Sequence, residues 1–372
     1  MSRARKLTMA SAMIAATAIA LSGCAASGSD AGTSDGLQTV TLGITPYQDT
    51  YLTLVGMDQG WFEEAGIDLQ LKKLAWNNVM TAVVSGDVDM AIQNTTGVIA
   101  VANTDPDLVY AFGYNPFTEG TALMIRPDGL ETVAQLEKGG LDHDAARTAF
   151  LESLRGKEVV TTLSTDMGKQ IIAALDSVGI AQSEVNFIDL DSDSGLAAFL
   201  AGTGDAYLGG IPQRQTLVDA GMLVGISGPD LSAPEINGIV TKRDFASTHQ
   251  DVVLSFINVM FRTIRYCDAN EDACAELITT ALNQEAAGGM TVEGWKSFWQ
   301  TLELHAVNAA QAKEWILEPD GIAYWKTTWD AGNEYFLESD SIPAPVDGAQ
   351  HFLMPEMWDA YVAEYGADET GY

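Results

Sequence analysis

The sequence contains 372 residues, of which 47% are hydrophobic and 19% are charged. At roughly 100–200 residues per domain, this length predicts two or three units with sizeable cores, and the apolar fraction excludes a wholly disordered chain. Lys and Arg number 19 against 51 Asp and Glu, which gives a formal net charge of -32. This charge excludes binding of nucleic acid through a basic surface and electrostatic docking on anionic lipid.

The N-terminus has the pattern of a secretory signal. Three basic residues precede an apolar run of small side chains over residues 9–21, which is shorter than the roughly 20 residues that a membrane span needs. The run ends in Leu21-Ser22-Gly23-Cys24, which resembles a bacterial lipobox, where the cysteine is diacylated and becomes the new N-terminus. We therefore expect a signal peptide over residues 1–23 and lipidation of Cys24. The alternative is an ordinary cleavable signal that contains a cysteine.

The segment after this signal is rich in Ala, Gly, Ser and Asp and has nothing to bury. Residues 24–37 are therefore predicted to form a flexible tether. We expect the mature protein outside the cytoplasm, attached to the cell membrane through its lipid anchor only.

From residue 39 the chain alternates short apolar strands with helices. The first run predicts strands at 40–44, 67–71 and 89–92 and helices at 49–59, 77–85 and 97–103. The second run predicts strands at 123–125, 156–162, 185–190, 206–209 and 239–241, with helices at 168–178 and 195–201. This alternation is typical of parallel strands joined by helical crossovers.

After about residue 248 the chain is mostly helical and rich in aromatic side chains. We expect five tryptophans to pack these helices onto one lobe, namely Trp295, Trp299, Trp315, Trp325 and Trp329. The alternative is that they form a cage around a ligand. Segments near 113–118 and 242–245 look like crossings between two lobes. We therefore predict a first lobe of residues 38–116 plus 244–372 and a second lobe of residues 117–243.

Cys267 and Cys274 flank a polar turn between two predicted helices. An oxidising compartment favours a local disulfide between them, and two buried thiols are the alternative. A zinc site is not expected, because no His or further Cys lies at ligand spacing.

Catalytic and metal-binding motifs are not found in the sequence. The four histidines, His143, His249, His305 and His351, are never paired at metal spacing, and neither a Walker loop nor a nucleophile elbow occurs. Residues 189–195 begin like a calcium loop, but Ser194 and Leu200 stand where such a loop needs Gly and Glu. We therefore expect a protein that is not an enzyme and has no metal and no cofactor.

Four polar loops follow predicted strands and begin helices, at residues 45–48, 75–78, 93–97 and 163–168. Free backbone N–H groups and the helix dipole favour anionic or polar ligand atoms at such positions, although each Ser, Thr or Asn taken alone is also a common N-cap. Tyr47, Trp76 and Tyr114 supply ring faces for an organic solute.

Four segments in register resemble the nitrate-, sulfonate- and taurine-type solute-binding proteins, a family that also includes binders of thiamine pyrimidine precursors. These segments are residues 54–69, 85–91, 154–159 and 201–207, and the resemblance covers roughly residues 39–245. It implies a type II periplasmic-binding fold: an α/β protein with two lobes, each a mostly parallel sheet flanked by helices, and here a helical C-terminal extension. It also implies delivery of a small molecule to the permease and ATPase of an ABC importer.

By position, the resemblance implies ligand contacts at Tyr47, Trp76, Asn77, Asn94, Thr95, Ser164, Thr165, Asp166 and Gln213. The chain departs from the family at 210–213, where an aromatic-acidic pair is common, and in a long insertion at 131–152. The expected ligand is a small organic solute: a sulfonate or a pyrimidine-like, aromatic or zwitterionic molecule. The scarcity of nearby cations, Lys169 and Arg214, favours a neutral, zwitterionic or aromatic one. A sensor subunit for a membrane receptor and an extracytoplasmic enzyme are the alternatives.

Overall fold

Two five-stranded sheets organise the chain in the computed structural model, which describes residues 36–284 and 289–372. The first sheet has the order β2-β1-β3-β10-β4, with β1 (Gln38–Ile44), β2 (Ile67–Lys73), β3 (Met90–Asn94), β4 (Leu108–Phe117) and β10 (Glu235–Lys242). The second has the order β7-β6-β8-β5-β9, with β5 (Ala122–Ile125), β6 (Glu158–Thr161), β7 (Asn186–Asp189), β8 (Ala206–Gly209) and β9 (Leu223–Ser227).

The two sheets have the same topology. In the first, β2, β1 and β3 are mutually parallel and β10 is antiparallel to both of its neighbours. In the second, β7, β6 and β8 are parallel and β5 is the antiparallel strand. Each sheet therefore has one strand that opposes the other four, which confirms the predicted pair of mostly parallel sheets.

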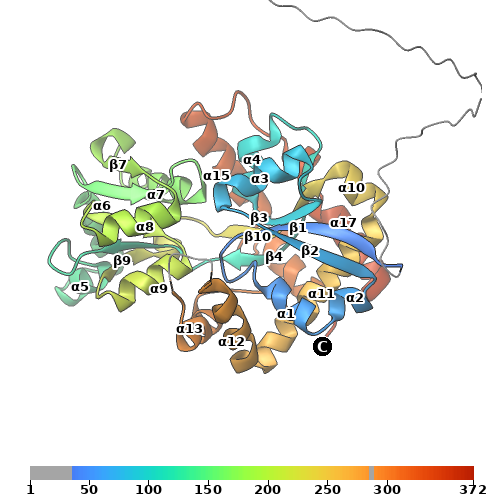
Figure 1. The fold of residues 1–372 in the computed structure, drawn as a ribbon. Helices are drawn as coiled ribbons and strands as arrows, with labels where there is room; N and C mark the ends of the chain where they lie inside the picture. The colour runs from blue at the N-terminus through green and yellow to red at the C-terminus, as the bar shows by residue number, and fades with distance from the viewer. Residues whose placement is uncertain (1–35, 285–288) are drawn as a thin grey trace, which may run out of the picture. The chain divides into compact units, whose positions relative to one another are not determined.

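The opposed strands are the ones that the chain enters after crossing between the lobes, from β4 to β5 and from β9 to β10 (Figure 1). The last parallel strand before each crossing ends at the edge of its sheet from which the chain leaves for the other lobe. The first strand after the crossing therefore begins at the corresponding edge of the other sheet and runs antiparallel to its neighbours there.

The second crossing comes before β10, and this corrects the expected lobe boundary. Ending the second lobe at residue 243 places residues 235–242 in that lobe, but β10 pairs with β3 and β4 in the first sheet. Strands β4 and β9 were missed in the sequence. Nine of the ten positions of β4 are buried, so β4 lacks the alternation of a half-exposed strand, and its Asn115-Pro116 pair is typical of a turn.

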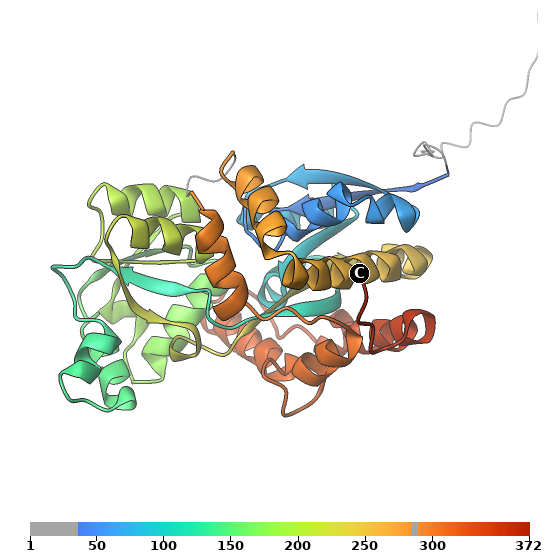
Figure 2. The same cartoon turned by 90° about the horizontal axis from the view of Figure 1, so that it is seen from below.

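Helices flank both sheets (Figures 1 and 2). Those of the second lobe are α5 (Val133–Lys138), α6 (His143–Glu152), α7 (Asp166–Asp176), α8 (Ser192–Leu200) and α9 (Ile211–Asp219). The first lobe begins with α1 (Leu52–Asp58), α2 (Trp61–Glu64), α3 (Trp76–Ser85) and α4 (Thr95–Ala102). The C-terminal extension adds α10 (Arg243–Thr248), α11 (Gln250–Ala269), α12 (Glu271–Leu282), α13 (Val292–Thr301), α14 (Ala309–Ala312), α15 (Trp325–Glu338), α16 (Gly348–His351) and α17 (Met354–Tyr365).

Aromatic side chains pack this extension onto the first lobe, as predicted. Trp295 and Trp329 are almost fully buried, and both belong to the same apolar cluster as the first sheet. Trp295 stacks on Trp299 with ring centroids 5.0 Å apart, and Trp325 stacks on Phe352 at 4.3 Å. The extension also contacts the second lobe, because Thr216 of α9 donates a hydrogen bond to the Gly289 carbonyl.

The cysteines after residue 250 form the predicted disulfide. Cys267 at the end of α11 and Cys274 in α12 are bonded and fully buried. The signal peptide, Cys24 and the tether up to residue 35 lie outside the described residues. Within the described part of the chain, we find no helix with the length and apolarity that a membrane crossing requires.

Candidate functional site

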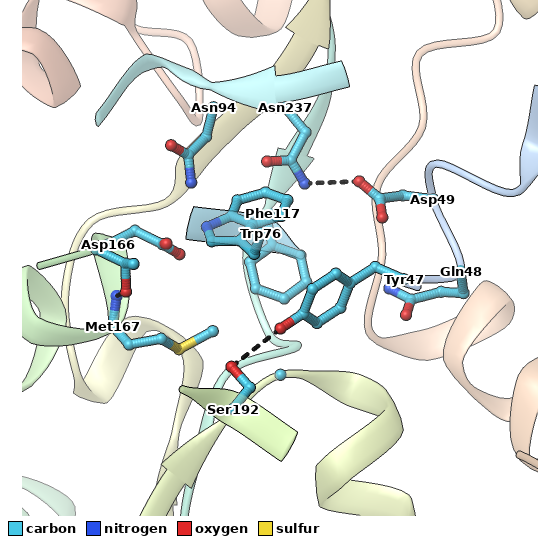
Figure 3. Close-up of a pocket in the computed structure, with 12 residues that line it drawn as sticks. Tyr47, Gln48, Asp49, Trp76, Asn94, Phe117, Asp166, Met167, Ser192 and Asn237 are labelled. Carbon is cyan, nitrogen blue, oxygen red and sulfur yellow. Dashed lines mark hydrogen bonds between the residues drawn. The ribbon is translucent and has the colours of Figure 1, made fainter. Parts of the chain in front are cut away.

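A cavity lies between the two sheets, where loops from both lobes meet (Figure 3). Its walls come from the loops after β1, β2, β6, β7 and β8, together with the ends of β3 and β4 and the start of β10. The lining residues are Tyr47, Gln48, Asp49, Trp76, Asn94, Phe117, Thr165, Asp166, Met167, Ser192, Gly210 and Asn237. Two further cavities adjoin it and share Trp76 and Thr165 with it.

Helix N-caps fix two of these loops. The Asn94 side-chain oxygen accepts from the Gly97 N–H at 2.9 Å and begins α4. Thr165 accepts from the Met167 N–H at 3.3 Å and begins α7. Asn and Thr favour this position because their side-chain oxygens satisfy N–H groups that have no partner inside the helix. The side-chain oxygens of Asn94 and Thr165 therefore act as helix N-caps.

Three aromatic rings from the first lobe form one wall of the cavity. Tyr47 and Trp76 pack edge to face with ring centroids 5.3 Å apart, and Phe117 lies beside them (Figure 3). The Tyr47 hydroxyl donates to the Ser192 hydroxyl at 3.1 Å, so this ring also links the first lobe to the second.

Two buried carboxyl groups face the cavity, one from each lobe. Asp49 accepts from the Asn237 amide at 3.1 Å, and burial raises its pKa to about 6. Burial, and then the negative charge of Glu235, raise the pKa of Asp166 to about 7, although Lys169 and a hydrogen bond from Asn94 oppose this shift. The Oδ1 atom of Asp166 has no hydrogen-bond partner among the described residues.

A third buried carboxyl group, Glu303, lies behind Gln48. Gln48 donates its side-chain N–H to Glu303, and burial and the nearby Asp49 raise the pKa of Glu303 to about 8. Burial lowers the pKa of His305 to about 3, and its Nε2 lies 3.4 Å from Glu303. Both groups are therefore neutral near pH 7, and their contact is not an ion pair.

The two cations named from the sequence are bound to other protein groups. Lys169 of α7 forms a buried ion pair with Glu235 of β10, which also accepts from Thr96 at 2.8 Å. This pair joins the two lobes. Arg214 donates to the Glu119 carbonyl at 2.7 Å. The central cavity is thus lined by carboxyl groups and by neither of these cations.

Most residues predicted to contact the ligand line one of the three cavities. Tyr47, Trp76, Asn94, Thr165 and Asp166 line the central one, whereas Asn77, Ser164 and Gln213 line the adjoining ones.

Two predicted contacts line none of these three cavities. Tyr114 is buried behind the cavity, where Asp49 and Glu303 act on its hydroxyl, and Thr95 is fully buried at the start of α4. In the described part of the chain, no group of three or more His, Cys, Asp or Glu side chains is placed to hold a metal ion.

Sequence reasoning missed several lining residues. Gln48 and Asp49 directly follow Tyr47, so the same loop already pointed to them. Ser192 lies in the acidic run whose other residues serve as helix caps, and Asn237 lies on β10, whose lobe was misplaced.

Comparison with known proteins gives two results. The model of the NMT1-like family matches residues 34–282. A search of curated proteins returned no match.

Solved structures of similar fold include binding proteins for sulfonates and nitrate. The alkanesulfonate-binding protein SsuA of Xanthomonas axonopodis pv. citri, bound to MOPS, has a TM-score of 0.64 and 14% identity over 84% of this chain and 97% of that chain. The aliphatic sulphonate-binding protein SsuA of Escherichia coli has a TM-score of 0.64 and 15% identity over 84% of this chain and 91% of that chain. The nitrate-binding protein NrtA of Synechocystis PCC 6803 has a TM-score of 0.60 and 13% identity over 88% of this chain and 89% of that chain.

These structures share the two-lobe architecture described above, so the fold is the type II periplasmic-binding fold. The family model covers more than half of the 372 residues. The chain belongs to the NMT1-like family.

Proposed function

We propose that this protein captures a small organic solute between its lobes and delivers it to the permease and ATPase of an ABC importer. The cavity lined by both lobes carries this proposal, because it lies where open α/β sheets bind ligands, beyond the carboxyl ends of their strands. The family match and the sulfonate- and nitrate-binding neighbours support the same role.

Binding without chemistry fits the groups in the cavity. The Ser192 hydroxyl accepts from Tyr47, which is a positioning contact and not the contact of a nucleophile with its base. We therefore propose that the predicted contact residues bind the solute and that the bound solute is released unchanged.

The N-terminal sequence supports attachment of this binding protein to the outer face of the cell membrane through a lipid on Cys24. Incorporation of labelled palmitate tests this: the protein should take up label, and Cys24→Ser should take up none and leave the membrane fraction. Label retained by the Cys24→Ser variant contradicts the anchor.

A thermal-shift screen over sulfonates, carboxylates, pyrimidines and amines tests the binding role, because a solute that binds only the folded protein raises its melting temperature. Trp76→Ala combined with Asn94→Ala should abolish the response to any solute that binds. The control is Tyr372→Phe, at a side chain that is 55% exposed and lies outside the three cavities. Undiminished affinity in the double variant contradicts the proposed cleft.

A further inference from the structure

Among the described residues that line the three cavities, the buried side-chain atoms without a hydrogen-bond partner are acceptors. Asp166, Gln48 and Gln213 are each 5% exposed or less, yet one side-chain oxygen of each has no hydrogen-bond partner among the described residues. Asp166 and Gln48 line the central cavity, and Gln213 lines an adjoining one. A buried acceptor without a partner costs free energy, so these oxygens favour a ligand that brings donors.

The orientation of both glutamine amides follows from their other contacts. The Gln48 N–H donates to Glu303, and the Gln213 N–H donates to Asp193 at 3.4 Å. Because each amide nitrogen faces a carboxyl group, the amide oxygen is left without a partner and can accept a hydrogen bond from the ligand.

The charge of the cavity leads to the same ligand class. Asp49 and Asp166 line it from opposite lobes, while Lys169 is paired with Glu235. Backbone N–H groups hold anions at many helix N-termini, and one such group is already occupied at each of two helices around the cleft, where Asn94 caps α4 and Thr165 caps α7. An anion entering this site would meet carboxyl groups where it needs donors.

The apolar wall completes the description of the ligand. Tyr47, Trp76 and Phe117 present ring faces and edges that can cover a flat organic group or a cation. We infer that the cleft selects an organic cation that carries N–H donors, a protonated amine or an amidinium, and rejects sulfonate and nitrate. This inference rests on the proposed function and names the class of solute.

A matched set of single-ring probes tests the inference. Benzylamine and benzamidine carry the cation, benzyl alcohol is neutral, and benzenesulfonate and nitrate are anions. Calorimetry on the purified protein should detect binding of the two cations and none of the two anions at the same concentrations. Binding of benzenesulfonate that equals or exceeds binding of benzamidine overturns the inference.

Two isosteric variants locate the recognition. Asp166→Asn and Asp49→Asn should each weaken benzamidine binding by about 10- to 100-fold, because each removes a charge-assisted hydrogen bond. Asp176→Asn, at an exposed carboxylate on the same helix as Asp166, should leave the affinity unchanged. Melting temperatures of the solute-free variants show whether each one folds, and unchanged benzamidine affinity in both folded cleft variants overturns the inference.

The Trp76→Ala variant separates the two possible failures. If anions bind the native protein and this variant loses them, the cleft binds solutes and only the inference of a cation is wrong. If no probe of any charge binds, or if binding does not depend on Trp76, both the inference and the proposed function fail.

Discussion

The two lobes share one strand order but differ in how they are stabilised. In the second lobe, alternate residues of the strands enter separate clusters on the two faces of the sheet: Leu123 and Ile125 on one face, Ala122 and Met124 on the other. In the first lobe a single cluster extends from the sheet into the C-terminal helices, and the disulfide lies within it. The same sheet topology therefore supports a first lobe with one large core that contains a disulfide and a second lobe with two smaller cores.

The lobes also differ in what they bring to the cavity. The first lobe supplies all three rings and Asp49, whereas the second supplies Asp166, Ser192 and the start of α7. Under the proposed function, we expect the first lobe to hold the flat part of a solute and the second to complete the polar contacts. Contacts that cross between the lobes should therefore control affinity, and contacts within a lobe should control stability.

Breaking the buried ion pair between the lobes should have the largest effect. Lys169→Met leaves Glu235 buried without its partner, at a cost of about 3–5 kcal/mol, unless the lobes separate and water reaches it. We expect solute affinity to fall by 100-fold or more, on the order of that free energy. The exposed pair of Lys157 and Asp205 in the second lobe is the matched control, and Lys157→Met should change affinity by less than about fivefold. Equal losses of affinity in the two variants would contradict the expectation that contacts between the lobes control affinity.

Stability of the solute-free protein should depend on pH through the buried acids of both lobes. Glu303 of the first lobe, which faces Gln48, Asp49 and neutral His305, has its pKa raised from 4.5 to about 8 by burial. Asp166 of the second lobe, which faces Asn94, Lys169 and Glu235, has its pKa raised from 3.8 to about 7.

The folded protein therefore keeps protons that the unfolded chain has lost. The contribution of these two acids to the free energy of unfolding should be highest below about pH 4 and fall as pH rises to about 8, by about 1.4 kcal/mol per pH unit for each group. Glu303→Gln should remove its share of the slope from about pH 4.5 to about 8, which includes the part above pH 7, whereas Asp166→Asn should lower the slope only below about pH 7. Chemical denaturation across this range measures both, and a free energy of unfolding independent of pH contradicts the prediction.

The hydrogen bond between Tyr47 and Ser192 should have the smallest effect. It joins the lobes at 3.1 Å and is half-buried, so Tyr47→Phe should cost about 1 kcal/mol of binding free energy, or roughly fivefold in affinity. Ser192→Ala should cost the same, and the double variant should cost no more than either one. Additive losses in this double-mutant cycle would show that the two hydroxyls act separately.

Two loops of the cleft could be predicted from the sequence because each combines a strand end, a capping residue and a helix start. Asn94 and Thr165 carry this local signal, and both line the cavity. The pattern does not give the direction of a strand or its partner in the other lobe. For that reason Asn237 and the pair of Lys169 with Glu235 could not be found: each depends on β10 returning to the first sheet.

Residue type alone also does not tell which aromatic and acidic side chains face the cavity. Tyr114 has the side chain expected to face a solute, yet it lies behind the cavity because nearly all of β4 is buried. Glu303 gave no signal, since it follows a helix of the C-terminal extension and reaches the cleft only through Gln48. Burial in the folded protein decides which of these groups meets a ligand.

The position of β10 has a consequence for synthesis of the protein. This strand lies between β3 and β4, although the whole second lobe separates it from them in the sequence. The first sheet therefore stays divided until the chain has been made as far as residue 242. An incomplete sheet buries less apolar surface than the finished one, so we expect the first lobe to complete its fold only after β10 has been made.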